Sequence, residues 1–210
     1  MLTFEEIRVL GVLIEKSKTT PDYYPMTLNG ITTACNQKSS RKPITDFSES
    51  EVSGALLQLK QKGLIATEIG GGSRTVKYRH CFRAVHPVTE GELTALCLLF
   101  LRGALTPGEI NSNSGRIYEY EGLQEVLTVL HNLQDRELPF VKELARQSGQ
   151  KENRWIQLLG VVAEEESQNL DVQVLETNNS NSLDVRVSNL EEEVIRLNKI
   201  VLDLVKELKG

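Results

Sequence analysis

The chain has 210 residues and a formal net charge of −5, with 40% hydrophobic and 25% charged residues. This composition is that of an ordinary globular protein and excludes wholesale disorder. The most apolar stretch, 93–105, is interrupted by Arg102 and is too short for the ~20 residues that a bilayer crossing needs. The first residues lack the basic and apolar regions of a signal peptide. We therefore expect a cytoplasmic protein without a membrane partner.

The charge is distributed unevenly along the chain. Residues 1–87 hold 12 Lys and Arg against 8 Asp and Glu, residues 88–160 hold 7 against 10, and residues 161–210 hold 5 against 11. The two later segments repel phosphates at long range. Any contact with a polyanion is therefore predicted for residues 1–87.

An internal repeat sets the predicted architecture. A Thr-x-x-Glu opening, followed by apolar residues at helical spacing, occurs at Thr3 and again 86 positions later at Thr89. Both openings have the form of a capping box, and Ser48 with Glu51 gives another. A second match, 74 positions apart, aligns Val52, Ala55, Leu56, Leu59 and Leu64 with Val126, Val129, Leu130, Leu133 and Leu138. Thr106 corresponds to Thr27 at an intermediate offset of 79.

Each copy ends in a predicted β-hairpin. The strands are expected in 65–69 and 75–82 of the first copy and in 139–146 and 153–159 of the second. Three helices followed by a hairpin are typical of a winged helix, in which the third helix enters the major groove of DNA. The sequence therefore predicts a mainly α fold with small β-hairpins (α+β). Its two tandem winged-helix domains are expected at 1–87 and 88–160.

The last part of the chain changes character. Residues 161–182 form an acidic and polar stretch that is typical of a linker. Residues 183–210 follow a heptad pattern that predicts a coiled-coil helix and a parallel homodimer. The heptad positions expected at the dimer interface are Leu183, Val187, Leu190, Val194, Leu197, Val201, Leu204 and Leu208. An amphipathic helix that folds back on its own body is the alternative.

The sequence shows no catalytic or metal-binding pattern. The three histidines fit no metal spacing, no serine lies in a G-x-S-x-G turn, and the glycine run 70–72 lacks the rest of a phosphate loop. Cys35, Cys81 and Cys97 share no C-x-x-C spacing, which predicts neither a disulfide framework nor a zinc site. We therefore expect a protein that is not an enzyme and that carries no metal or cofactor.

A basic surface on the first domain suggests binding to double-stranded DNA. The cations expected to neutralise phosphates are Lys38, Arg41 and Lys42 between the second and third helices, and Arg74, Lys77 and Arg79 on the wing. Gln58 and Gln61 on the third helix are expected to read bases. Glu49 and Glu51, in its first turn, oppose this reading. A DNA-binding regulator is the leading hypothesis, and a scaffold that docks a protein partner through its acidic second half is the alternative.

Several runs of the chain resemble the YceH-like family of bacterial proteins. They include Arg-Val-Leu-Gly-Val-Leu-Ile-Glu-Lys at 8–16, Thr-Thr-Pro-Asp-Tyr-Tyr-Pro at 19–25, Lys-Tyr-Arg-His at 77–80 and Thr-Pro-Gly-Glu at 106–109. The resemblance covers nearly the whole chain and implies a tandem winged-helix fold with a largely uncharacterised function. This chain has Lys42 where the family often has an acidic residue before the proline, which favours a basic surface. It has Asn111 and Asn113 where the family often has basic residues, which weakens a nucleic-acid role for the second domain.

Overall fold

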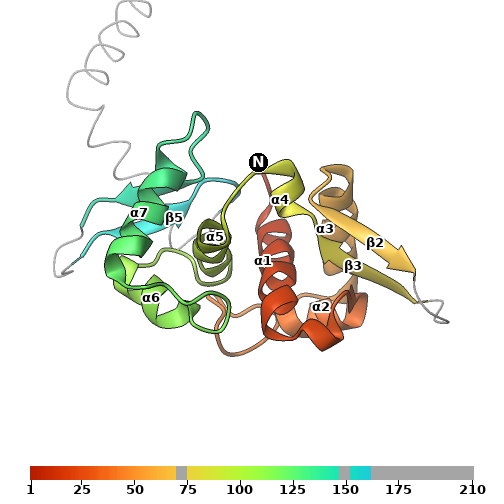
Figure 1. Ribbon diagram of the computed structural model, residues 1–210. Helices are drawn as coiled ribbons and strands as arrows, with labels where there is room; N and C mark the ends of the chain where they lie inside the picture. Colours follow the sequence, from red (N-terminus) through yellow and green to blue (C-terminus); the bar gives the residue numbers. More distant parts are fainter. Residues whose placement is uncertain (70–74, 147–151, 162–210) are drawn as a thin grey trace, which may run out of the picture. The chain divides into compact units, whose positions relative to one another are not determined.

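The computed structural model describes residues 1–69, 75–146 and 152–161 (Figure 1). Met1–Glu166 forms one compact unit. Three sequence predictions lie outside the described residues: Arg74 on the first hairpin, the linker beyond Val161, and the heptad positions from Leu183 to Leu208. In the described part of the chain, no helix combines the length and the apolar character that a membrane crossing requires.

The first copy contains three main helices and a small antiparallel sheet. Its elements are α1 (Phe4–Thr19), a 3-10 helix at Pro21–Tyr23, β1 (Met26–Thr27), α2 (Leu28–Cys35), α3 (Glu49–Gln61), β2 (Ile65–Ile69), β3 (Val76–His80) and the short α4 (Phe82–Val85). The strand order is β1-β3-β2, with Met26 opposite Tyr78 and Ile65 opposite His80. The predicted helices and hairpin are thus present, and β1 is an addition that the sequence pattern did not predict.

The second copy repeats this order of elements. It contains α5 (Glu90–Arg102), α6 (Pro107–Ser114), α7 (Leu123–Gln134), β4 (Val141–Leu144) and β5 (Arg154–Gln157). The strands β4 and β5 are antiparallel, and Leu105 forms an antiparallel bridge with Trp155 on the other side of β5. Backbone hydrogen bonds of 3.0 and 2.7 Å join Leu105 and Trp155 in both directions. Leu105 therefore pairs with Trp155 as Met26 pairs with Tyr78.

The predicted capping boxes at Thr3, Ser48 and Thr89 are confirmed, and Thr106 adds a fourth. In each, the hydroxyl accepts a hydrogen bond from the backbone N–H three residues on, and the glutamate there accepts one from the capping residue. The helix α7 begins differently, since its N-cap Gly122 has no side chain. The predicted capping boxes thus located the starts of α1, α3 and α5.

One residue match between the copies was wrong. Leu138 does not correspond to the buried Leu64, because its side chain is 78% exposed. Phe140 takes that position: its N–H donates to Leu133 O at 3.0 Å, as the Leu64 N–H donates to Leu59 O at 2.9 Å. The turn after α7 is two residues longer than the turn after α3, which the pattern of apolar residues did not reveal.

The helices α1 and α5 lie side by side at the centre, with α2, α3 and the first hairpin on one side and α6 and α7 on the other (Figure 1). A continuous cluster of buried apolar side chains runs through both copies. Leu2 closes the unit by hydrogen bonds of 2.9 Å to the backbone of Leu159 and Val161. The predicted domain boundary at residues 87 and 88 thus lies within one compact unit, and it stays a prediction.

Candidate binding surfaces

Arg41 was expected on a phosphate-binding surface, but the structure buries it. Its guanidinium donates to Glu15 through two hydrogen bonds, of 3.1 Å to Oε1 and 2.6 Å to Oε2. Further donors reach the carbonyls of Ala34 and Ser40 and the side chain of Gln37. Burial alone would raise the pKa of Glu15, but the hydrogen bonds and charge of Arg41 hold that pKa below its ordinary value. Arg41 has no surface left for a phosphate, and the sequence-based assignment of this residue is corrected.

Arg8 is a second buried cation, which was not among the site residues predicted from the sequence. Its side chain is fully enclosed, and it donates to Cys35 O at 3.3 Å and to Pro43 O at 2.8 Å. Burial, with a contribution from the nearby charge of Arg41, lowers the pKa of Arg8 to about 10. The available signal was its position within the apolar run of α1. Hydrogen bonds from Arg8 and Arg41 together hold the loop 36–48 in place. The loop therefore has a fixed conformation in the folded protein.

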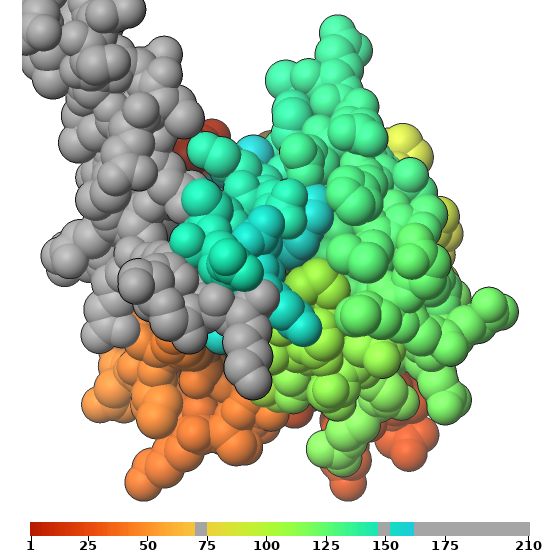
Figure 2. All heavy atoms as spheres, turned by 90° about the vertical axis from the view of Figure 1, so that its left-hand side faces the viewer, coloured from red at the N-terminus to blue at the C-terminus, as the bar shows by residue number. Residues whose placement is uncertain are grey.

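The remaining predicted cations do not converge on one face. Lys38 and Lys42 are exposed on the loop 36–48. Figure 2 views the molecule from the side of the second copy, and this loop is visible there next to that copy. The backbone N–H of Lys42 donates to Leu101 O of α5 at 2.8 Å. Lys77 and Arg79 lie on β3, whose hairpin projects on the opposite side in Figure 1. Arg79 Nε is 2.5 Å from Glu68 Oε1. The predicted basic surface is thus divided between two sides of the molecule.

An apolar groove lies between α3 and the β2–β3 hairpin. Gln58 and Gln61 are exposed on α3, as predicted, but they are not among the residues that line this groove. We call it the first groove; its volume is about 430 Å³. Three of its apolar side chains are unusually open to solvent, with exposed fractions of 56% for Leu57, 74% for Ile69 and 37% for Val76. Single exposed apolar residues are common, but a contiguous group marks a site of interaction. The sequence predicted polar contacts on this helix and gave no sign of the apolar ones.

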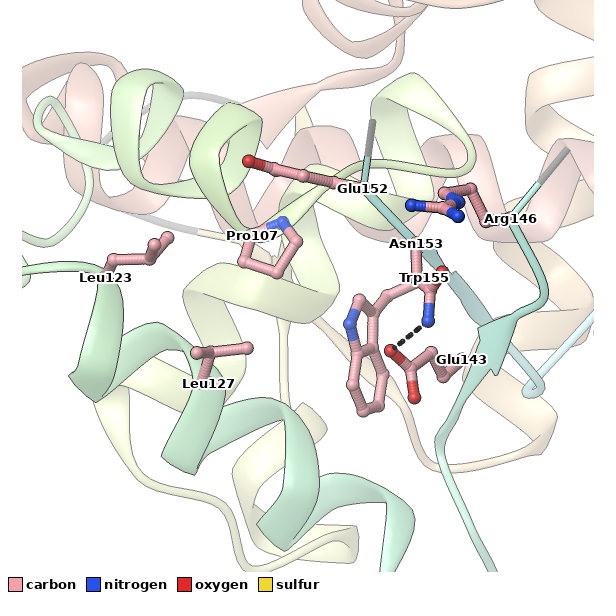
Figure 3. Close-up of a pocket in the computed structure, with 8 residues that line it drawn as sticks. All are labelled: Pro107, Leu123, Leu127, Glu143, Arg146, Glu152, Asn153 and Trp155. Carbon is pink, nitrogen blue, oxygen red and sulfur yellow. Dashed lines mark hydrogen bonds between the residues drawn. The ribbon is translucent and has the colours of Figure 1, made fainter. Parts of the chain in front are cut away.

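A second groove occupies the equivalent place in the second copy, between α7 and the β4–β5 hairpin. Figure 2 looks onto this side of the unit, where α7 and the hairpin lie next to each other. Its volume is about 350 Å³ (Figure 3). The lining residues are Pro107, Leu123, Leu127, Glu143, Arg146, Glu152, Asn153 and Trp155. Trp155 and Tyr78 hold matching strand positions, so the two copies place a groove at the same point of the fold but line it with different chemistry.

These features define a mixed α/β protein of two helix-and-hairpin copies, each with an open groove beside its third helix. Among the residues that the structure describes, no group of His, Cys, Asp and Glu side chains is placed to hold a metal ion. Open grooves of this kind suit the binding of a ligand. Similarity to known proteins also places the chain in a family.

The chain belongs to the family described as "Protein of unknown function, DUF480", whose model matches residues 2–150. It is 42% identical to a UPF0502 protein of Shewanella halifaxensis over 211 residues, covering 97% of this chain and 98% of the relative. It is 44% identical to a UPF0502 protein of Chromobacterium violaceum over 205 residues, covering 98% of this chain and 91% of the relative. The bacterial family predicted from the motifs is confirmed at this level.

Proposed function

We propose that the chain is a protein-binding module, without enzymatic activity, built from two winged-helix units in tandem. The order of three helices and a hairpin in each copy, with a short third strand beside the hairpin, supports the winged-helix assignment. Winged helices serve both nucleic acids and proteins, so the surface must decide between these partners. The heptads of 183–210 add the prediction that two copies of the chain associate.

The first groove is the observation that carries the proposal. In a DNA-binding winged helix, the third helix presents polar and cationic side chains to the major groove and the backbone. Here α3 presents Leu57 at its exposed surface, beside Ile69 and Val76 of the hairpin, and it has Glu49 and Glu51 in its first turn. Apolar side chains gain free energy when a protein partner covers them, whereas carboxylates in the first turn repel phosphates.

The charges around the first groove specify the partner. Lys60 is the charged residue among the described residues that line the groove. In the described part of the groove no carboxylate is among the lining residues. The proposed occupant is therefore an apolar segment of another protein that carries acidic side chains beside its apolar ones.

The proposal is tested with a photo-cross-linking residue at Gln58, exposed on α3, in the bacterium that makes the protein. We expect one discrete adduct whose partner sequence contains an apolar and acidic segment. The substitution Leu57→Asp should abolish the adduct, because it places a charge in the apolar contact. Leu138→Asp is the matched control, since it changes an exposed leucine of the second copy. An absent adduct, or one that survives Leu57→Asp, overturns the proposal.

DNA binding is the second candidate, and the exposed Gln58 and Gln61 on α3 and Lys77 on β3 favour it. It is tested by titrating duplex DNA at about 50 and 200 mM salt, because added salt weakens binding more steeply the more phosphates the protein contacts. The variants are Lys77→Ala and Leu57→Asp. Salt-dependent binding that is lost with Lys77→Ala and kept with Leu57→Asp would establish the DNA function in place of the protein-binding one.

A further inference from the structure

The second groove differs from the first because it contains an unpaired hydrogen-bond donor. Trp155 is 1% exposed, and its indole Nε1 has no hydrogen-bond acceptor among the described residues. Leaving a buried N–H unpaired costs about 1–3 kcal/mol, and native structures rarely tolerate it without a reason. Figure 3 shows the nitrogen edge of the indole facing the space between Pro107 and Leu127. An acceptor inside the groove would remove this cost.

The walls of the groove around that donor are apolar. Leu123 and Leu127 lie one turn apart on α7, and Pro107 begins α6 on the adjoining wall (Figure 3). The volume of about 350 Å³ is at the lower end of the range for small-molecule sites. The floor and walls therefore suit a small apolar group that carries a hydrogen-bond acceptor.

The rim of the groove supplies two charges of opposite sign. Arg146 is exposed, and no hydrogen bond or ion pair joins it to another described residue. The Glu152 carboxylate lies beside Gly108 in the first turn of α6 and likewise has no such partner among the described residues. Arg154 and Glu109 neutralise each other through two hydrogen bonds. Glu143, the second carboxylate of the lining, accepts a hydrogen bond of 2.9 Å from the Asn153 amide and keeps its charge.

We propose that the second groove binds a free α-amino acid with an apolar side chain. Arg146 would pair with the carboxylate, and the Trp155 N–H would donate to one of its oxygens. Glu152 would pair with the ammonium group, and the side chain would lie against Leu123 and Leu127. This combination of a cation, an anion and apolar walls selects a zwitterion over a simple fatty acid or amine. The inference is independent of the protein-binding function proposed for the first groove.

The chain offers a direct reporter, because Trp155 is its one tryptophan. The ¹H–¹⁵N spectrum of the full chain therefore contains one indole signal, which is followed while L-leucine is added up to millimolar concentration. We expect a saturable downfield shift of the indole proton, as its N–H gains an acceptor. Glycine, which lacks the apolar side chain, should bind at least about tenfold more weakly, since burial of a leucine side chain contributes more than 1.4 kcal/mol.

Two variants separate the roles of the rim charges. Arg146→Gln should weaken L-leucine about tenfold or more by removing a charge-assisted hydrogen bond, and Arg116→Gln, an exposed arginine outside the groove, is the matched control. Glu152→Gln should weaken L-leucine and leave 4-methylpentanoate, which lacks the ammonium group, unaffected. N-acetyl-leucine and leucinamide stand for the two termini of a peptide, and both should bind more weakly than the free amino acid.

The proposal is overturned if the indole signal does not move, if glycine moves it as strongly as leucine, or if Arg146→Gln binds leucine like the native chain. Tighter binding of N-acetyl-leucine or leucinamide would overturn it in favour of a peptide terminus. Leu57→Asp should leave the leucine titration unchanged, so that failure of this inference and failure of the protein-binding function remain distinguishable.

Discussion

Arg41 and Glu15 form a buried ion pair between the loop 36–48 and α1. The Arg41 side chain is fully enclosed, and that of Glu15 is 13% exposed. Both charges have lost most of their hydration, and their free energy in the folded protein depends on each other. The same pair excludes Arg41 from any contact with a ligand, so its role is to fix the loop that carries Lys38 and Lys42.

Removal of Arg41 is expected to destabilise the protein strongly. Arg41→Ala should lower the free energy of unfolding by about 3–5 kcal/mol, because it leaves the Glu15 carboxylate buried without a counter-charge. The free energy is measured by urea denaturation. Lys42→Ala, the adjacent exposed position, is the control and should change it by less than about 0.5 kcal/mol. Equal effects of the two substitutions would show that the Arg41–Glu15 pair does not anchor the loop.

His80 gives the folded protein a specific dependence on pH. Its Nε2 lies 3.3 Å from Ser17 Oγ, and its buried Nδ1 has no hydrogen-bond partner in the described part of the chain. Burial, with the nearby charge of Lys18, lowers the pKa of His80 from 6.5 to about 4. Between these two values the unfolded chain binds more protons than the folded one. The contribution of neutral His80 to the free energy of unfolding is therefore complete above pH 6.5, and it is lost as the pH falls toward 4.

The substitution His80→Gln should flatten this pH dependence. The native chain is expected to lose stability between pH 6.5 and pH 4, and the variant should lose less over the same interval because glutamine takes up no proton. Urea denaturation at several pH values measures both. Gln58→Ala, at an exposed position of α3 that carries no titrating group, serves as the control and should keep the native slope. If His80→Gln kept the native dependence of stability on pH, the group that titrates in this interval would lie elsewhere.

The sequence predicted the exposure and pairing of individual residues only in part. The positions of Lys38, Lys42 and Lys77 at the surface could be predicted, because lysine rarely loses its hydration. The burial of Arg41 could not, since it depends on Glu15, a partner 26 positions away on another element. The unpaired Trp155 N–H could not be predicted from the sequence either, because a missing partner is a property of the packed structure. Contacts between residues that are distant in the sequence decide whether a side chain is buried or paired. Composition and local spacing do not reveal these contacts.

The contact between α1 and α5 depends on a glycine. A Cβ atom at Gly11 would lie 3.0 Å from Phe100 Cβ and 3.0 Å from Leu101 Cδ2, which is tighter than nine in ten Cβ contacts in real proteins. Neither neighbour is free to move, because both lie in the buried core. The close approach of the two copies therefore requires the absence of a side chain at position 11.

Gly11→Ala and Gly54→Ala are expected to act in opposite directions. Gly11→Ala should destabilise the protein by about 1–3 kcal/mol through overpacking, despite the better helix propensity of alanine. At Gly54 on α3 a Cβ meets nothing within 4 Å, so Gly54→Ala should stabilise by about 0.5–1 kcal/mol. Thermal unfolding of both variants measures the difference. A stabilising Gly11→Ala would mean that α1 and α5 can separate without cost.

At the element scale, the sequence predicted what is encoded locally. The capping boxes located the starts of α1, α3 and α5, and the repeat located the hairpins. The third strand position at Met26 and Leu105 escaped prediction, because a two-residue strand has no periodicity of its own. The grooves also escaped, since each requires the distance between a helix and a hairpin, which no pattern along one element specifies.

The whole described unit is expected to unfold in one cooperative transition. The buried cluster crosses from one copy to the other, and Leu2 pairs with the backbone at the end of the second copy. A Cβ atom at Gly160 would lie 2.6 Å from Leu2 O and 2.6 Å from Ile7 Cγ1, so Gly160→Ala strains the point where the two copies join. Because the copies share one core, this strain should lower the stability of both.

Two probes follow the copies separately during urea denaturation. Trp155 fluorescence reports on the second copy, and hydrogen exchange of the α3 peptide reports on the first. The two midpoints should coincide in the native chain and move together in Gly160→Ala, whereas Gly115→Ala, with nothing within 4 Å of its Cβ, should move neither by much. If only the Trp155 midpoint moved, the copies would be independent domains, and each groove would then belong to a unit that binds its ligand without coupling to the other.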